Sequence, residues 1–64
     1  MKILVNGEPR DVVATTLEDA LSELGFGGRV ATAVNEEFVA ASQRTSHILK
    51  EGDRVEIVAP MQGG

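Results

Sequence analysis

Residues 17–24 read LEDALSEL and decide the fold, because they carry the clearest helix pattern in this 64-residue chain. Apolar side chains recur there at spacings of three and four residues, which places them in one stripe along a helix. The stripe consists of Leu17, Ala20, Leu21 and Leu24. The charged and hydroxyl residues between them are expected to face water. A helix with one apolar stripe needs one other layer to bury it.

The residues flanking this stretch predict where the helix begins and ends. Thr15 with Glu18, or Thr16 with Asp19, fits the arrangement in which a threonine and an acidic residue three positions later cap a helix start. Gly25 is well placed as the residue just beyond the helix end. The predicted helix is therefore short and bounded on both sides.

Strand patterns lie on both sides of the predicted helix. Residues 1–6 alternate, with Met1, Ile3 and Val5 on one face. Asn6-Gly7 predicts a tight hairpin turn, since both residues tolerate positive φ. The predicted strands cover residues 1–6, 10–14, 29–35, 38–39 and 53–59.

The pattern predicts an α+β fold with one mixed sheet of four to five strands and a single main helix packed on one face. The first and last strands each carry an apolar face, formed in the last strand by Val55, Ile57 and Ala59. Pairing these two strands in parallel at the sheet centre buries both faces, which is the β-grasp arrangement of ubiquitin. We expect one β-grasp domain over residues 1–60 and a flexible tail over residues 61–64.

The composition excludes several classes of protein and site. The chain has no cysteine, which excludes disulfides, thiolate zinc sites and a cysteine nucleophile. A net charge of −4 without a basic patch or aromatic platform argues against nucleic acid. The adjacent acids Glu36-Glu37 and the single His47 predict solvated residues, with no metal site. No apolar stretch approaches the roughly 20 residues of a membrane span, and we expect a cytoplasmic protein without a bound cofactor.

The most informative site candidate is the ending Met61-Gln62-Gly63-Gly64. Two glycines without a Cβ let another surface approach closely, so the ending predicts a handle that enters a narrow active site. The reactive group would be the carboxylate of Gly64, with Met61, Gln62 and Gly63 in the partner's channel. The alternation also places Leu4 and Val58 on the face away from the helix. Together with Met61 they predict a docking patch near the exit of the tail.

The chain resembles the sulfur carriers of bacterial thiamine biosynthesis along its whole length. The resemblance rests on MKILVNG at residues 1–7, AVN at 33–35, EGD at 51–53 and VEIVAPMQGG at 55–64. One departure is Ala40-Ala41, where family members often carry Pro-Arg after the valine. This departure affects a local turn and leaves the tail untouched.

The resemblance implies a carrier that is acted on by partner enzymes and is not itself an enzyme. An adenylating enzyme would use ATP to activate Gly64, and a persulfide protein would convert Gly64 to a thiocarboxylate. A thiazole synthase would then take the sulfur. The residues leave open a molybdopterin synthase small subunit, a ubiquitin-like modifier, or a binding module with an incidental tail.

Overall fold

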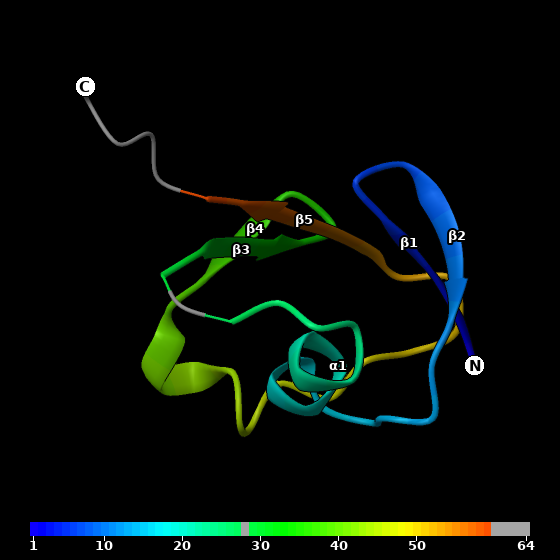
Figure 1. Ribbon diagram of the computed structural model, residues 1–64, viewed down its shortest axis with the longest axis horizontal. Coiled ribbons are helices and arrows are strands. Elements are labelled where there is room, and N and C mark those ends of the chain that lie inside the picture. The colour runs from blue at the N-terminus through cyan, green and yellow to red at the C-terminus, as the bar shows by residue number, and fades with distance from the viewer. Residues whose placement is uncertain (28, 60–64) are drawn as a thin grey trace.

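The computed structural model describes residues 1–27 and 29–59, and within them five strands form one mixed sheet in the order β2-β1-β5-β3-β4. The main helix, α1, lies across one face of this sheet (Figure 1). The elements are β1 Lys2–Val5, β2 Glu8–Asp11, α1 Leu17–Glu23, β3 Ala31–Val34, β4 Glu37–Val39, a short 3₁₀ helix η1 Ala41–Gln43, and β5 Arg54–Val58. The predicted α+β, β-grasp architecture is confirmed.

Strand β5 occupies the middle of the sheet, although it comes last among the strands along the described chain. It pairs in parallel with β1, with Leu4 opposite Arg54 and Val5 opposite Val55. On its other edge it pairs antiparallel with β3. The predicted parallel pairing of the first and last strands is therefore confirmed.

The helix begins at a threonine cap, as predicted. The Thr16 hydroxyl accepts a hydrogen bond of 3.1 Å from the Asp19 N–H, which selects Thr16 over Thr15 as the cap. Gly25 follows the helix end with φ of +84°. The Gly25 N–H donates to Ser22 O and the Phe26 N–H to Leu21 O, which satisfies carbonyls that a helix end leaves free.

The core lies between α1 and the sheet. Three of the four stripe residues are buried and Leu24 is partly buried. They join the inward residues of the sheet and two loop residues in one buried cluster: Ile3, Val5, Val12, Leu17, Ala20, Leu21, Val34, Val39, Leu49, Val55 and Ile57. The predicted core faces of the first strand and the helix are confirmed.

One arginine is buried at the margin of this core. Arg44 follows η1 and is 9% exposed. Its Nε donates to the Thr32 hydroxyl at 3.0 Å, and its Nη2 donates to Val30 O. These bonds satisfy polar groups that would be costly to bury alone. They tie the segment after β4 to β3.

The predicted strand bounds differ from the observed ones, most clearly in the second and third strands, and one predicted core residue was wrong. The second strand is Glu8–Asp11 instead of residues 10–14, because the two-residue turn at Asn6-Gly7 pairs Val5 directly with Glu8. The third strand is Ala31–Val34, shorter than residues 29–35. Ala59 is exposed and not on the core face, because pairing ends where Val58 meets Ala31, the first residue of β3.

Neither helix in the described part of the chain is long and apolar enough to cross a membrane.

Candidate functional site

The predicted functional tail, residues 61–64, follows β5 in the sequence. The predicted tail residues Met61, Gln62, Gly63 and Gly64 lie outside the described residues, as does the predicted domain boundary at residue 60. The structure does describe Val58 and Ala59, the residues that lead to this segment. At its end β5 pairs with β3 through Val58 and Ala31, which fixes the position of Val58 in the sheet, whereas its pairing with β1 covers Arg54 and Val55.

The two faces of β5 differ sharply. Val55 and Ile57 are buried beneath α1, while Arg54, Glu56 and Val58 are exposed. Val58 is 62% exposed, so the alternation predicted the strand register correctly. The role of Val58 in docking stays a prediction.

The structure does not place Leu4 close to Val58, and whether Leu4 takes part in docking stays a prediction. Leu4 lies opposite Arg54, at the beginning of β5, whereas Val58 is its last residue. At a rise of about 3.3 Å per residue these positions are roughly 13 Å apart along the strand. Leu4 is also half-buried, and it lines a shallow hollow with Arg54 and Glu56 instead of lying near the chain's exit.

Other apolar residues share the bare face with Val58, one directly beside it and two farther across β3 and β4. Ala31 of β3 pairs with Val58, and Ala33, two residues along the same face, pairs with Phe38 of β4. Phe38 is 72% exposed. The alanines of β3 are small, so the larger side chains of Phe38 and Val58 project beyond them on this face. We call these four residues the exit patch: Ala31, Ala33, Phe38 and Val58.

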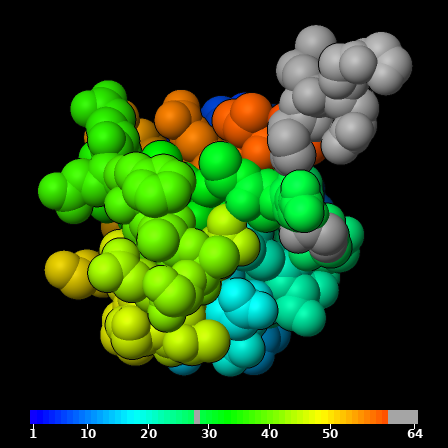
Figure 2. All heavy atoms as spheres, turned by 90° about the vertical axis from the view of Figure 1, so that its left-hand side faces the viewer, coloured from blue at the N-terminus to red at the C-terminus, as the bar shows by residue number. Residues whose placement is uncertain are grey.

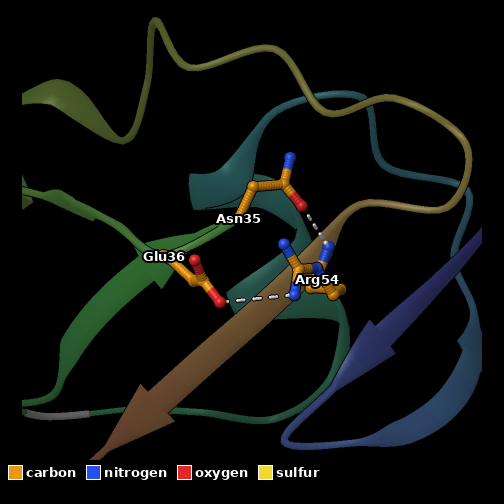
Figure 3. A network of polar contacts seen from close by, with 3 residues as sticks. All are labelled: Asn35, Glu36 and Arg54. Atoms are coloured by element: carbon orange, nitrogen blue, oxygen red, sulfur yellow. Dashed lines mark hydrogen bonds and ion pairs between the residues drawn. The ribbon is translucent and has the colours of Figure 1, made fainter.

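An open hollow and charged side chains lie beside the exit patch. Arg29 and Val30 join Ala31 and Val58 around an open hollow beside the patch. Figure 2 shows the β3–β4 hairpin, in green, next to the orange-red end of β5 on one rim of the molecule. Charged residues also lie on this face: the exposed Glu56 of β5 pairs with Ala33 of the exit patch, and farther along Arg54 and Glu36 form an ion pair of 3.5 Å (Figure 3). Both side chains are more than half exposed, so this pair adds little stability.

Sequence reasoning missed Phe38. In the three-residue strand β4 the sequence offers Phe38 and Val39 side by side, and so short a run gives no period from which to tell which one faces outward. The pairing of Val39 with the buried Thr32 decides it, turning Phe38 to the bare face. Phe38 is one of only two aromatic residues in the sequence, and this scarcity is the signal that could have drawn attention to it.

The chain resembles known proteins over its full length. The model of the ThiS family matches residues 3–64. A curated sulfur carrier protein ThiS of Thermus thermophilus is 41% identical over 63 residues, which cover 97% of this chain and 98% of that protein. A crystal structure of the thiamine biosynthesis protein ThiS of Geobacter metallireducens superposes with a TM-score of 0.85 at 29% identity, covering 100% of both chains.

A second kind of relative is much longer. A thiazole synthase of Paramagnetospirillum magneticum is 42% identical over 66 aligned residues, which cover 100% of this chain but 20% of that protein. One of Magnetococcus marinus is 41% identical, with the same shares covered. The family match, the near-complete coverage of the curated carrier and the shared fold agree, and the chain belongs to the ThiS family.

Proposed function

We propose that this protein is a sulfur carrier of thiamine biosynthesis and works as a co-substrate of partner enzymes. The observation that carries the proposal is the family match that extends through Gly63-Gly64, in a chain whose central strand leads towards that ending. The described residues offer no group of three or more histidine, aspartate or glutamate side chains that could hold a metal ion. We assign the chemistry to the carboxylate of Gly64 and to the partners because the family match includes the Gly63-Gly64 ending.

The first step activates this carboxylate. A terminal carboxylate with an ordinary pKa near 3.3–3.7 is ionised at neutral pH and is a poor electrophile. An adenylating enzyme would transfer AMP from ATP to Gly64 and release pyrophosphate, giving an acyl adenylate. This step requires the chain to end at Gly64, with its backbone in the partner's ATP site.

The second step exchanges oxygen for sulfur. A persulfide on a partner cysteine attacks the acyl carbon and displaces AMP, which joins Gly64 to the partner through two sulfur atoms. A thiol then cleaves the sulfur–sulfur bond, leaving a thiocarboxylate on Gly64 and a disulfide between the thiols. The thiocarboxylate is a sulfur nucleophile, which a thiazole synthase would consume.

The long relatives support a thiazole synthase as the acceptor. In each of them a segment like this chain occupies about a fifth of a protein named thiazole synthase. A carrier and its acceptor on one polypeptide raise the effective concentration of one for the other. We propose that a thiazole synthase is also the acceptor for this chain. For the activating enzyme, which acts earlier, we propose the exit patch as the contact surface.

Removal of Gly63 and Gly64 tests the function. The truncated protein should unfold within roughly 0.5 kcal/mol of the parent, as for other surface changes, and ATP–pyrophosphate exchange with the activating enzyme should vanish. Intact-mass spectrometry of the parent after reaction should show oxygen replaced by sulfur at Gly64.

A matched control separates the handle from the bulk of the tail. Gly63→Val keeps the length of the chain but adds a branched Cβ, so activation should be lost with an unchanged fold. Undiminished exchange by the truncated chain would contradict the proposal. Thiazole formation in the reconstituted system would separate this function from the molybdopterin alternative.

A further inference from the structure

The two edges of the sheet are built alike but are not equally open. Strands β2 and β4 form these edges (Figure 1). Each follows a two-residue hairpin turn that begins with an asparagine at positive φ, Asn6 before β2 and Asn35 before β4. The second residue of each edge strand therefore occupies an equivalent place in its hairpin. That residue is Pro9 in β2 and Phe38 in β4.

The hydrogen bonds between β1 and the chain after β2 show that the backbone of Pro9 faces away from the sheet. Met1 and Val12 exchange both of their backbone bonds, at 2.7 and 2.9 Å. Bonded and non-bonded pairs alternate along an antiparallel ladder, and the pair of Pro9 with Leu4 lies three pairs farther along. It is therefore a non-bonded pair. Because proline has no N–H, this outward position offers a partner strand no donor.

Phe38 faces outward in the same way but keeps both backbone groups. The Asn35 N–H donates to Arg54 O at 2.7 Å, so the chain points towards β5 at Asn35 and again two residues earlier, at Ala33. Ala33 lies opposite Phe38, and the N–H and C=O of Phe38 therefore point away from β3. Within the described part of the chain neither group has a hydrogen-bond partner. β4 thus has an open edge centred on Phe38.

The side chains beside this open edge differ between the two faces. Phe38 lies on the bare face, in the exit patch, and is mostly exposed. Glu37 is exposed on the covered side, because it lies opposite the buried Val34. It lines a hollow together with Lys50 but forms no ion pair among the described residues. A strand added to this edge would meet an aromatic ring on one face and a carboxylate on the other.

We propose that the edge of β4 pairs with an extended strand of the activating enzyme, an inference that rests on the proposed carrier function. An antiparallel strand would satisfy both outward groups of Phe38 with a single residue. That strand should place an apolar side chain next to the Phe38 ring and a lysine or arginine opposite Glu37. The sheet of the carrier then continues into its partner, and the exit patch continues onto the added strand.

Charge and position favour this occupant over a second copy of the chain. The net charge of −4 makes two copies repel each other, whereas it attracts a basic strand. Phe38 belongs to the exit patch, so a partner seated on that patch already lies beside the open backbone. A single outward residue in a three-residue strand adds to a larger contact but does not by itself hold two copies together.

Removal of the outward N–H alone tests the strand pairing. The chain of 64 residues can be made by chemical synthesis, and N-methylation of the Phe38 nitrogen removes the donor while the ring stays. Titration calorimetry with the activating enzyme should show about tenfold weaker binding, from the lost hydrogen bond and its unpaired acceptor. N-methylation of Asp11 is the matched control, because Asp11 is an outward residue of β2, next to the bonded pair of Met1 with Val12. This control should bind within about twofold of the parent.

Recombinant variants test the same point if the synthetic protein does not fold. Phe38→Ala removes the ring and keeps the donor, whereas Phe38→Pro removes both. The fold accepts proline at the equivalent place in β2, which is occupied by Pro9. Phe38→Pro should bind about threefold or more weakly than Phe38→Ala. Circular dichroism checks that both variants keep the fold.

Charge reversal tests the predicted chemistry of the partner strand. Glu37 and Glu8 are the exposed first residues of β4 and β2, and each lies opposite a buried valine. Glu37→Lys should weaken binding about tenfold at low salt, and the loss should shrink as salt screens the contact. Glu8→Lys changes the net charge equally and should alter the affinity by no more than about twofold. Equal effects of the two variants would overturn the basic strand.

Several other results would overturn the strand pairing. These are parent-like binding after N-methylation of Phe38, an equal loss after N-methylation of Asp11, and no binding of the parent to the activating enzyme. A free chain that sediments as a dimer, and as a monomer once Phe38 is N-methylated, would assign the edge to a second copy.

The Gly63-Gly64 deletion separates this inference from the carrier function. If the deletion supports ATP–pyrophosphate exchange like the parent, the carrier function fails. If the deletion is inactive while the chain N-methylated at Phe38 is bound and activated like the parent, only the strand pairing fails.

Discussion

The two faces of the sheet divide the work of this protein. The covered face packs Ile3, Val55 and Ile57 beneath α1, and the bare face presents Phe38 and Val58 to solvent. Both sets are apolar, but burial turns the first into folding free energy, and exposure leaves the second available for a partner. In β5 buried and exposed residues alternate along a single strand, so the strand that stabilises the core also carries part of the surface that we propose for docking.

Leucine truncation on each face gives the largest contrast. Leu21 is 5% exposed in the core, and Leu21→Ala should cost about 2–5 kcal/mol, a large share of what a small domain possesses. We expect a protein largely unfolded at physiological temperature. Leu4→Ala, at a half-buried site on the bare face, should cost less than half as much. Thermal and urea unfolding monitored by circular dichroism would measure the stability of both variants. An equal loss of unfolding free energy in the two would show that the bare face contributes to stability as much as the covered face.

Charge on the bare face should affect binding before it affects folding. Val58→Glu puts a carboxylate into an apolar contact, which interface centres avoid, and should weaken binding to the activating enzyme about tenfold or more. Titration calorimetry measures the affinity. The matched control is Ile48→Glu, because Ile48 is 60% exposed and lies outside the exit patch, in a bridge with Thr16. Equal weakening by both variants would mean that charge, and not the exit patch, decides affinity.

Phe38 tests whether the exit patch extends to β4. Aromatic residues often dominate interface energetics, so Phe38→Ala should cost roughly 1–2 kcal/mol of binding free energy. The free energy of unfolding should change by no more than about 0.5 kcal/mol, because the ring is mostly exposed. Binding unchanged in Phe38→Ala but weakened in Val58→Glu would confine the contact to β5.

The turn of the β3–β4 hairpin offers the smallest effect. Glu36 has φ of 73°, a left-handed conformation that costs a residue with a Cβ about 1–2 kcal/mol. Glu36→Gly relieves this cost and loses only the weak pair with Arg54. We expect about 0.5–1 kcal/mol of added stability in urea unfolding and no change in binding. If Glu36→Gly also bound the activating enzyme more tightly, binding by the bare face would depend on the stability of the fold.

The sequence was sufficient where a long pattern repeated. The alternation of β1 and β5, the helix stripe and its caps, and the Asn6-Gly7 turn all predicted the observed structure. It was insufficient for β2, an edge strand whose four residues are all exposed, because such a strand has no apolar period. The exit patch depends on the pairing of β3 with β4 and β5. Asn6 meets Ile57 across 51 residues, a contact that no local pattern encodes.

The strand order also constrains the order in which the sheet assembles during folding. The β1–β2 and β3–β4 hairpins each form from neighbouring residues, yet they touch in the sheet only through β5. A chain emerging during synthesis can make both hairpins early, but it cannot join them until its last strand arrives. Such long-range pairing is slow compared with local contacts. Completion of the sheet therefore waits for β5, and a molecule in which β5 is not yet paired lacks both the joined sheet and the complete exit patch, to which β5 contributes Val58.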